Sequence, residues 1–274
     1  MQNQPARTTR LATLTCFAFG SLAISLIGGC SSIHDVTGSI AAPSQTVPRN
    51  DADRRAYTSE WGNRYTSNPS DVGVAMNYAK GLKSLGRYGQ AASVLQVAVM
   101  HNPKDMDLRA EYGKALVDSG DLVQASAVLN NAQTPDHLSW SVLSAQGTIA
   151  DQTGDHNHAQ YLYHQALQIS PNEPSVLSNL GLSYALSKNL PQAEQVLAQA
   201  ANDPRSDSRI RQNYALVLSL EGKFNQAEQV SARDLPPSEA AANVAAIRQM
   251  IAQSNTWRDI QNVHPAHQPP HKKG

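Results

Sequence analysis

Small and apolar residues recur at intervals of 34 positions along most of this 274-residue chain. One series is small in every member: Ala79, Gly113, Gly147, Gly181 and Ala215. A second series consists of alanine alone: Ala91, Ala125, Ala159, Ala193 and Ala227. A fixed period of this length indicates a fold of stacked repeats, and it outweighs any local pattern.

Each repeat is predicted to be a pair of antiparallel helices. In the first repeat the helices are expected over residues 72–85 and 88–100, with Gly86 supplying the turn because glycine accepts positive φ. Asn102-Pro103 ends the second helix, since a residue before proline is disfavoured in the helical region. The small series is predicted to mark the points where two helices cross closely.

Stacked repeats need caps at both ends. Residues 51–68 carry Tyr57, Trp61 and Tyr65 at helical spacing and predict a leading cap. The repeats follow over about 72–235, and a closing helix is expected over about 237–258. The predicted fold class is therefore all-α, a solenoid of helical hairpins over residues 51–260, followed by a disordered tail at 261–274.

The pattern resembles the tetratricopeptide repeat. The segment Leu180-Gly181-Leu182-Ser183-Tyr184, followed by Ala193, Leu197 and Ala200, is the nearest copy. Departures from the pattern are few: Pro135 and Pro204 are displaced, Lys188 replaces a turn glycine, and Ser231 and Asp234 stand where apolar residues belong. The fifth copy is accordingly expected to be degenerate.

The amino terminus has the layout of a secretory signal, with Arg7 and Arg10 before an apolar run from Leu11 to Ile27. Gly28-Gly29-Cys30 follows and resembles the lipobox of bacterial lipoproteins. The resemblance implies cleavage after residue 29 and acylation of Cys30 on its thiol and amine. The alternatives are an ordinary secreted protein or an uncleaved anchor.

Residues 30–50 contain Ser, Thr, Pro and Gly with few large apolar groups, which is typical of a flexible tether. Ser31 follows the cysteine, whereas the best-known Gram-negative sorting rule places an aspartate there in inner-membrane lipoproteins. The expected location is therefore the outer membrane, facing the periplasm. The whole chain has 22 basic and 22 acidic residues, which does not favour nucleic-acid binding.

No catalytic constellation rises above chance, so the chain is not expected to be an enzyme or to need a cofactor or small-molecule substrate. Two sets of histidines could ligate zinc: His156 with His158, and His264 with His267 and His271. A polar turn and a solvated tail are the favoured interpretations. Glu111 and Asp118 share a helix face and are interpreted as solvated.

The tetratricopeptide resemblance implies a concave groove lined by the first helix of each repeat. Its predicted contacts with a protein partner fall into three groups: lysines (Lys80, Lys83, Lys114), asparagines (Asn77, Asn179, Asn213) and leucines (Leu182, Leu186, Leu216). The lysines would favour an acidic stretch or a carboxylate, and the leucines would grip apolar side chains. The asparagines could instead satisfy helix ends or solvent.

The plan of signal, lipidated cysteine, tether and about five repeats resembles the TadD-type lipoproteins of tight-adherence (Flp) pilus machines and the pilotins. That resemblance implies a non-enzymatic factor that helps a secretin reach the outer membrane or assemble there. The alternative is a periplasmic scaffold for outer-membrane protein insertion or for cell-wall and division enzymes.

Overall fold

The computed structural model describes residues 47–48 and 50–263, with side chains as far as Gln253. The predicted signal, Cys30, most of the tether and the three tail histidines lie outside the described residues. No helix in the described part is long and apolar enough to cross a membrane.

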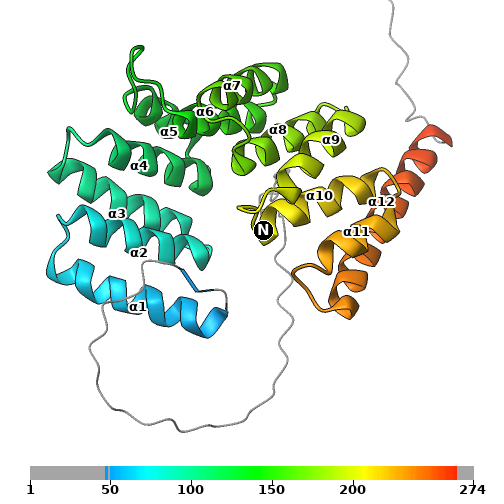
Figure 1. The fold of residues 1–274 in the computed structure, drawn as a ribbon, viewed down its shortest axis with the longest axis horizontal. Helices are drawn as coiled ribbons and strands as arrows, with labels where there is room; N and C mark the ends of the chain where they lie inside the picture. Colours follow the sequence, from blue (N-terminus) through cyan, green and yellow to red (C-terminus); the bar gives the residue numbers. More distant parts are fainter. Residues whose placement is uncertain (1–46, 49, 264–274) are drawn as a thin grey trace, which may run out of the picture. The chain divides into compact units, whose positions relative to one another are not determined.

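The described part is all-α, as predicted, and contains twelve helices (Figure 1). The first helices of the five pairs are α2 (Val72–Ser84), α4 (Met106–Ser119), α6 (Trp140–Gln152), α8 (Pro174–Leu186) and α10 (Ser208–Leu220). The second helices are α3 (Tyr88–His101), α5 (Leu122–Asn130), α7 (His156–Ile169), α9 (Leu190–Asn202) and α11 (Phe224–Ser231). The flanking helices are α1 (Asp51–Ser67) and α12 (Pro237–Val263).

The turns within the pairs follow the glycine prediction. Gly86, Gly120, Gly154 and Gly222 all have φ between 71° and 87°, a region that glycine enters without steric cost. Lys188 occupies the corresponding turn of the fourth repeat with φ 66°, although it carries a side chain. The turn geometry is therefore kept where the glycine is lost.

The small series lies at close helix crossings, as predicted. A Cβ built on Gly113 would lie 2.6 Å from Leu129 Cγ, and one built on Gly181 would lie 2.5 Å from Leu197 Cγ. Both leucines are fully buried. Glycine is thus required because the neighbouring leucine fills the space that a side chain would take.

The first helices form a continuous inner layer. α2, α4, α6, α8 and α10 each contact the next member of that series, whereas α3, α5, α7, α9 and α11 make no such contacts with one another in the described part. Because the first helices contact one another and the second helices do not, the layer of first helices forms the concave face. The core divides along α6, whose Val142 packs with the first two repeats and whose Leu143 packs with later ones.

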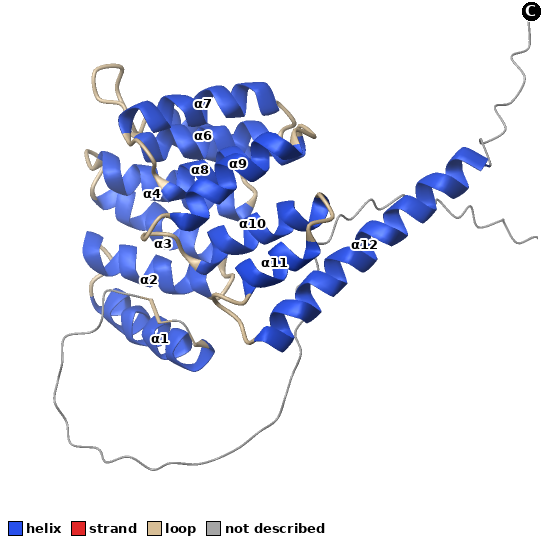
Figure 2. Cartoon of the chain, turned by 45° about the vertical axis from the view of Figure 1, so that its right-hand side comes forward, coloured by secondary structure: helices blue, strands red, loops and turns tan. Residues whose placement is uncertain are grey.

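The two ends are closed differently. Tyr57 and Trp61 of α1 are buried, while α12 packs through Ala240 and Val244 against α10 and α11 and continues beyond them (Figure 2). α11 ends after eight residues at Ser231, where the apolar pattern fails. Asp234 then accepts hydrogen bonds from the Arg211 guanidinium at 2.5 and 2.6 Å, which fixes the shortened end of the fifth repeat.

Candidate partner-binding groove

A hollow of about 340 Å³, here called the inner pocket, lies on the concave layer and is touched by all five first helices. Its walls include Lys83 of α2, Lys114 of α4, Trp140 of α6, Asn179 of α8 and Arg209 of α10. The tetratricopeptide resemblance implied a common groove for Lys83, Lys114 and Asn179, and all three line this pocket. One ligand in this pocket could contact every repeat.

The lysines of the inner pocket already have acidic partners. Lys83 Nζ lies 2.7 Å from Asp118 Oδ2, and Lys114 pairs with Glu111. The two acidic residues interpreted as solvated thus neutralise two of the lysines expected to attract an acidic partner. Partly exposed pairs contribute about 0–1 kcal/mol, so a carboxylate on a ligand can still compete for these lysines.

Asparagines link successive first helices. Asn179 Nδ2 donates to Ser144 Oγ at 3.1 Å, and Asn213 Nδ2 donates to Ser178 Oγ at 3.0 Å. Each bond uses one of the two amide N–H groups. Asn179 is half-buried and lines the inner pocket, so its remaining amide groups are positioned to meet a bound backbone.

Asn77 is placed differently from the other two asparagines. It is only 7% exposed, accepts a hydrogen bond from Tyr57 Oη at 3.1 Å and donates to Gly73 O at 2.8 Å. The leading helix α1 supplies that tyrosine. Asn77 therefore anchors the cap to the first repeat, and the expectation that it contacts a partner is corrected.

The leucines expected to grip a partner lie on α8 and α10, outside the walls of the inner pocket. Leu182 and Leu216 are half-buried, while Leu186 is 57% exposed at the end of α8. Lys80 is exposed on α2 and borders a separate small hollow at the first repeat. The predicted contacts thus spread along the concave layer from the first repeat to the fifth.

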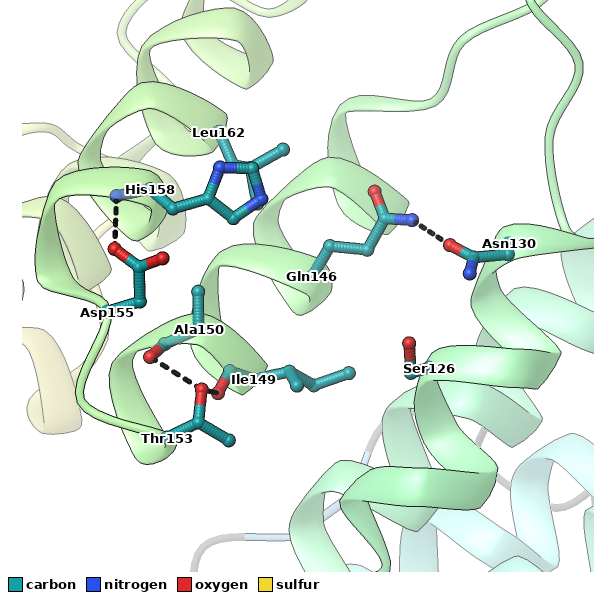
Figure 3. A pocket seen from close by; sticks show the side chains of 9 residues that line it. All are labelled: Ser126, Asn130, Gln146, Ile149, Ala150, Thr153, Asp155, His158 and Leu162. Carbon is teal, nitrogen blue, oxygen red and sulfur yellow. Dashed lines mark hydrogen bonds between the residues drawn. The ribbon is translucent and has the colours of Figure 1, made fainter.

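Sequence reasoning did not foresee a second hollow, of about 400 Å³, between α5 and the α6–α7 hairpin (Figure 3). Asn130 and Gln146 face one another across it, joined by a hydrogen bond of 2.9 Å, and His158 projects from α7. α5 has only nine residues, against fourteen in α3, and its last residue, Asn130, lines the hollow. The sign in the sequence that the second repeat departs from the pattern here was Pro135, which is displaced from the expected position.

The loop histidines have structural partners or neighbours. His156 Nδ1 lies 2.8 Å from Asp151 Oδ1, and the His158 ring stacks on Tyr161 with centroids 6.2 Å apart. Among the described side chains no group of three or more potential metal ligands comes together. Both histidines lie in the first turn of α7, which begins at His156.

The paired helices, inner layer and groove define a helical-repeat scaffold. Residues 82–139 and 152–217 match the model of the tetratricopeptide repeat, and the unmatched stretch between them falls on α6. The two matched segments are similar to tetratricopeptide repeats, and the described part of the chain is a solenoid of helical hairpins. Tetratricopeptide repeats bind protein partners in general. A search of curated proteins found no significant match.

Solved structures support the fold. The Cut9–Hcn1 complex of APC/C is 16% identical with a TM-score of 0.55, over 70% of this chain and 40% of that one. PilW, described as a widely conserved type IV pilus biogenesis factor, is 16% identical with a TM-score of 0.53, over 71% and 91%. A tetratricopeptide protein of Thermus thermophilus is 22% identical with a TM-score of 0.51, over 61% and 91%. The chain spans half or less of the first structures it matches.

Proposed function

We propose that this protein is a non-enzymatic scaffold that holds a segment of a protein partner along its concave layer. The observation that carries the proposal is the inner pocket, because a single hollow is reached by the first helix of every repeat. Its walls combine an aromatic ring at Trp140, an amide at Asn179 and cations at Lys114 and Arg209. These groups suit a peptide, which offers apolar side chains, a polar backbone and carboxylates.

The proposed setting is the periplasmic face of the outer membrane, with the chain anchored through an acylated Cys30. The supporting observation is the sequence around that residue, a basic start and an apolar run ending in Gly28-Gly29-Cys30. Two or more acyl chains give stable membrane attachment. The tether at residues 31–50 would then hold the repeats near the membrane surface.

Within that setting the proposed partner is a secretin, whose assembly or outer-membrane targeting the protein assists in a tight-adherence (Flp) pilus or a type II-like secretion system. The shared fold with PilW is compatible with pilus biogenesis, although that likeness concerns fold alone. The second candidate is a scaffold for outer-membrane protein insertion or for cell-wall and division enzymes. A secretin and pilin gene cluster beside this gene would favour the first function.

Crosslinked pull-down from the outer membrane tests the proposal. The wild-type chain is expected to return a secretin subunit, and Leu186→Glu and the double change Leu182→Glu with Leu216→Glu are expected to reduce its recovery at least ten-fold. Val123→Glu is the matched control, because Val123 is 86% exposed on the outer helix α5. Recovery of a barrel-insertion or division protein would support the second candidate instead.

Helicity must be unchanged in each variant for the comparison to count. Leu186 is exposed at the end of α8, so its replacement leaves the core intact even if the half-buried leucines do not tolerate a charge. Unchanged capture by a folded Leu186→Glu chain and a folded double variant would remove the leucine-lined part of the concave layer, on α8 and α10, from the mechanism.

A further inference from the structure

The chain's own segment before α1 lies against the first-repeat end of the concave layer. Val47 is half-buried and forms one wall of a hollow of about 220 Å³. The other walls include Met76 and Ala79 of α2, Leu95 of α3 and Glu111 of α4. A residue four positions before the first helix thus meets three helices of the first two repeats.

The floor of this hollow is apolar and belongs to the core. Ala79 and Leu95 are 1% and 2% exposed, and Met76 packs partly buried against the same cluster. An aliphatic side chain entering here removes apolar surface from water on both sides, which is the main favourable term in association. About 220 Å³ remains beside Val47, so the hollow has room for a larger aliphatic group.

The local sequence explains why this segment arrives as an extended chain. Pro48 disfavours the helical conformation at Val47. Asn50 then caps α1, its side chain accepting from Asp53 N at 2.8 Å. Helix α1 therefore starts at Asp51, and Val47 is held a few residues from a fixed point beside the hollow.

We propose that the first-repeat end of the groove is a docking site for an extended segment bearing an aliphatic side chain, and that the chain's own Val47-Pro48 segment occupies it. This inference deepens the proposed function and rests on it. If a partner binds along the concave layer as far as the first repeat, it must displace the Val47-Pro48 segment. The site is then self-covered until such a partner arrives.

The charges favour a displaceable occupant. Lys80 and Lys83 border the hollow, and Lys80 forms no ion pair among the described residues. Residues 40–48 contain no charged side chain, so the chain's own segment gives Lys80 no counter-charge. A partner segment that combines an aliphatic residue with a nearby carboxylate gains an interaction that the chain's own segment cannot make.

A peptide of residues 40–50, labelled with fluorescein, is the probe, and fluorescence anisotropy reports its binding to the full chain in detergent. The key variant is Val47→Ser, chosen over glutamate because a carboxylate could pair with Lys80. Val36→Ser, in the tether, is the matched control. A linked segment competes at an effective concentration of order millimolar, so the occupied wild type should bind the probe about ten-fold more weakly than Val47→Ser.

The expected pattern has three further parts. The Val36→Ser chain binds the probe as the wild type does. A probe that carries the Val47→Ser change does not bind to the Val47→Ser chain. Met76→Glu, added to the Val47→Ser chain, abolishes probe binding while helicity is retained. Equal probe binding by the wild-type and Val47→Ser chains, or no binding by either, would overturn the proposal. Leu182→Glu with Leu216→Glu should leave probe binding unchanged, so failure here is distinguishable from failure of partner capture.

Discussion

Tyr163 of α7 donates a hydrogen bond of 3.0 Å from its phenol to Asp151 Oδ2, near the end of α6. Ser183 of α8 donates to the other oxygen of the same carboxylate at 2.8 Å. Tyr163 is 1% exposed, and the Asp151 side chain is 9% exposed. One carboxylate therefore joins three consecutive helices across the boundary between the third and fourth repeats.

Removal of this carboxylate should destabilise the solenoid. Asp151→Ala leaves the Ser183 hydroxyl without its acceptor and the Tyr163 hydroxyl with only its longer bond, of 3.4 Å, to Thr148 Oγ1. An unsatisfied buried group costs about 1–3 kcal/mol. We expect the free energy of unfolding, measured by urea denaturation, to fall by about 2–4 kcal/mol. Asp136→Ala, in an exposed loop, is the control, and a loss no larger than the control's would contradict the assigned role.

Alkaline pH should weaken the fold through Tyr163. Burial raises the pKa of Tyr163 well above its usual value near 10, so the folded chain keeps a proton that the unfolded chain loses. The unfolded state then binds fewer protons, and the free energy of unfolding falls as pH rises above about 10, by up to about 1.4 kcal/mol per unit. Below that pH the stabilisation is fully present.

Tyr163→Phe removes this tyrosine's share of the pH dependence. Urea unfolding at pH 9 and pH 11 should give a smaller difference for the variant than for wild type, even though the variant is less stable at pH 9. Tyr57, Tyr112 and Tyr214 also have pKa values raised by burial, so some dependence remains. Equal slopes in the two proteins would show that Tyr163 ionises freely.

The close crossing of α8 and α9 should not tolerate even one added methyl group. A Cβ on Gly181 would lie 2.5 Å from Leu197 Cγ, so Gly181→Ala forces a core leucine to move. Overpacking of this kind costs about 1–3 kcal/mol. Leu197→Ala should be less damaging in the Gly181→Ala background than in wild type; additive losses in a double-mutant cycle would argue against the clash.

Lys188 offers a stabilising substitution. It holds φ at 66°, where a side chain costs about 1–2 kcal/mol, and glycine avoids that cost at the expense of a more flexible unfolded chain. Lys188→Gly should therefore raise the free energy of unfolding by about 0.5–1 kcal/mol. Lys104→Gly, at a position without positive φ, should lower it.

The repeat pattern was enough to predict the helix pairs, because turn glycines and close crossings impose residue types directly on the sequence. Gly86 and Gly181 are such cases. The short length of α5 was not predicted. This helix ends at Asn130, and the only sign of its early end in the sequence was the displaced Pro135. Asn130, where α5 stops, lines the hollow in Figure 3.

The side-chain contacts of the groove were harder to predict because they join residues of neighbouring repeats. Lys83 pairs with Asp118, Asn179 with Ser144 and Asn213 with Ser178. Each of these pairs is separated by 35 positions, one repeat plus one residue. The 34-residue period identified which residues occupy equivalent positions in successive repeats. It did not predict that contacts between neighbouring first helices join residues 35 positions apart. The burial of Asn77 was not predicted for another reason: its contact with Tyr57 depends on how the leading helix α1 packs against the first repeat.

The 35-residue offset has a consequence for how such a groove can change length. The fourth repeat carries both members of the serine–asparagine link, Ser178 and Asn179, so duplication of that 34-residue unit would place the copied Asn179 35 positions after Ser178 and recreate the link at the new junction. The number of repeats could therefore grow by copies of this unit during evolution, matching longer partners, while the serine–asparagine link between adjacent units is kept.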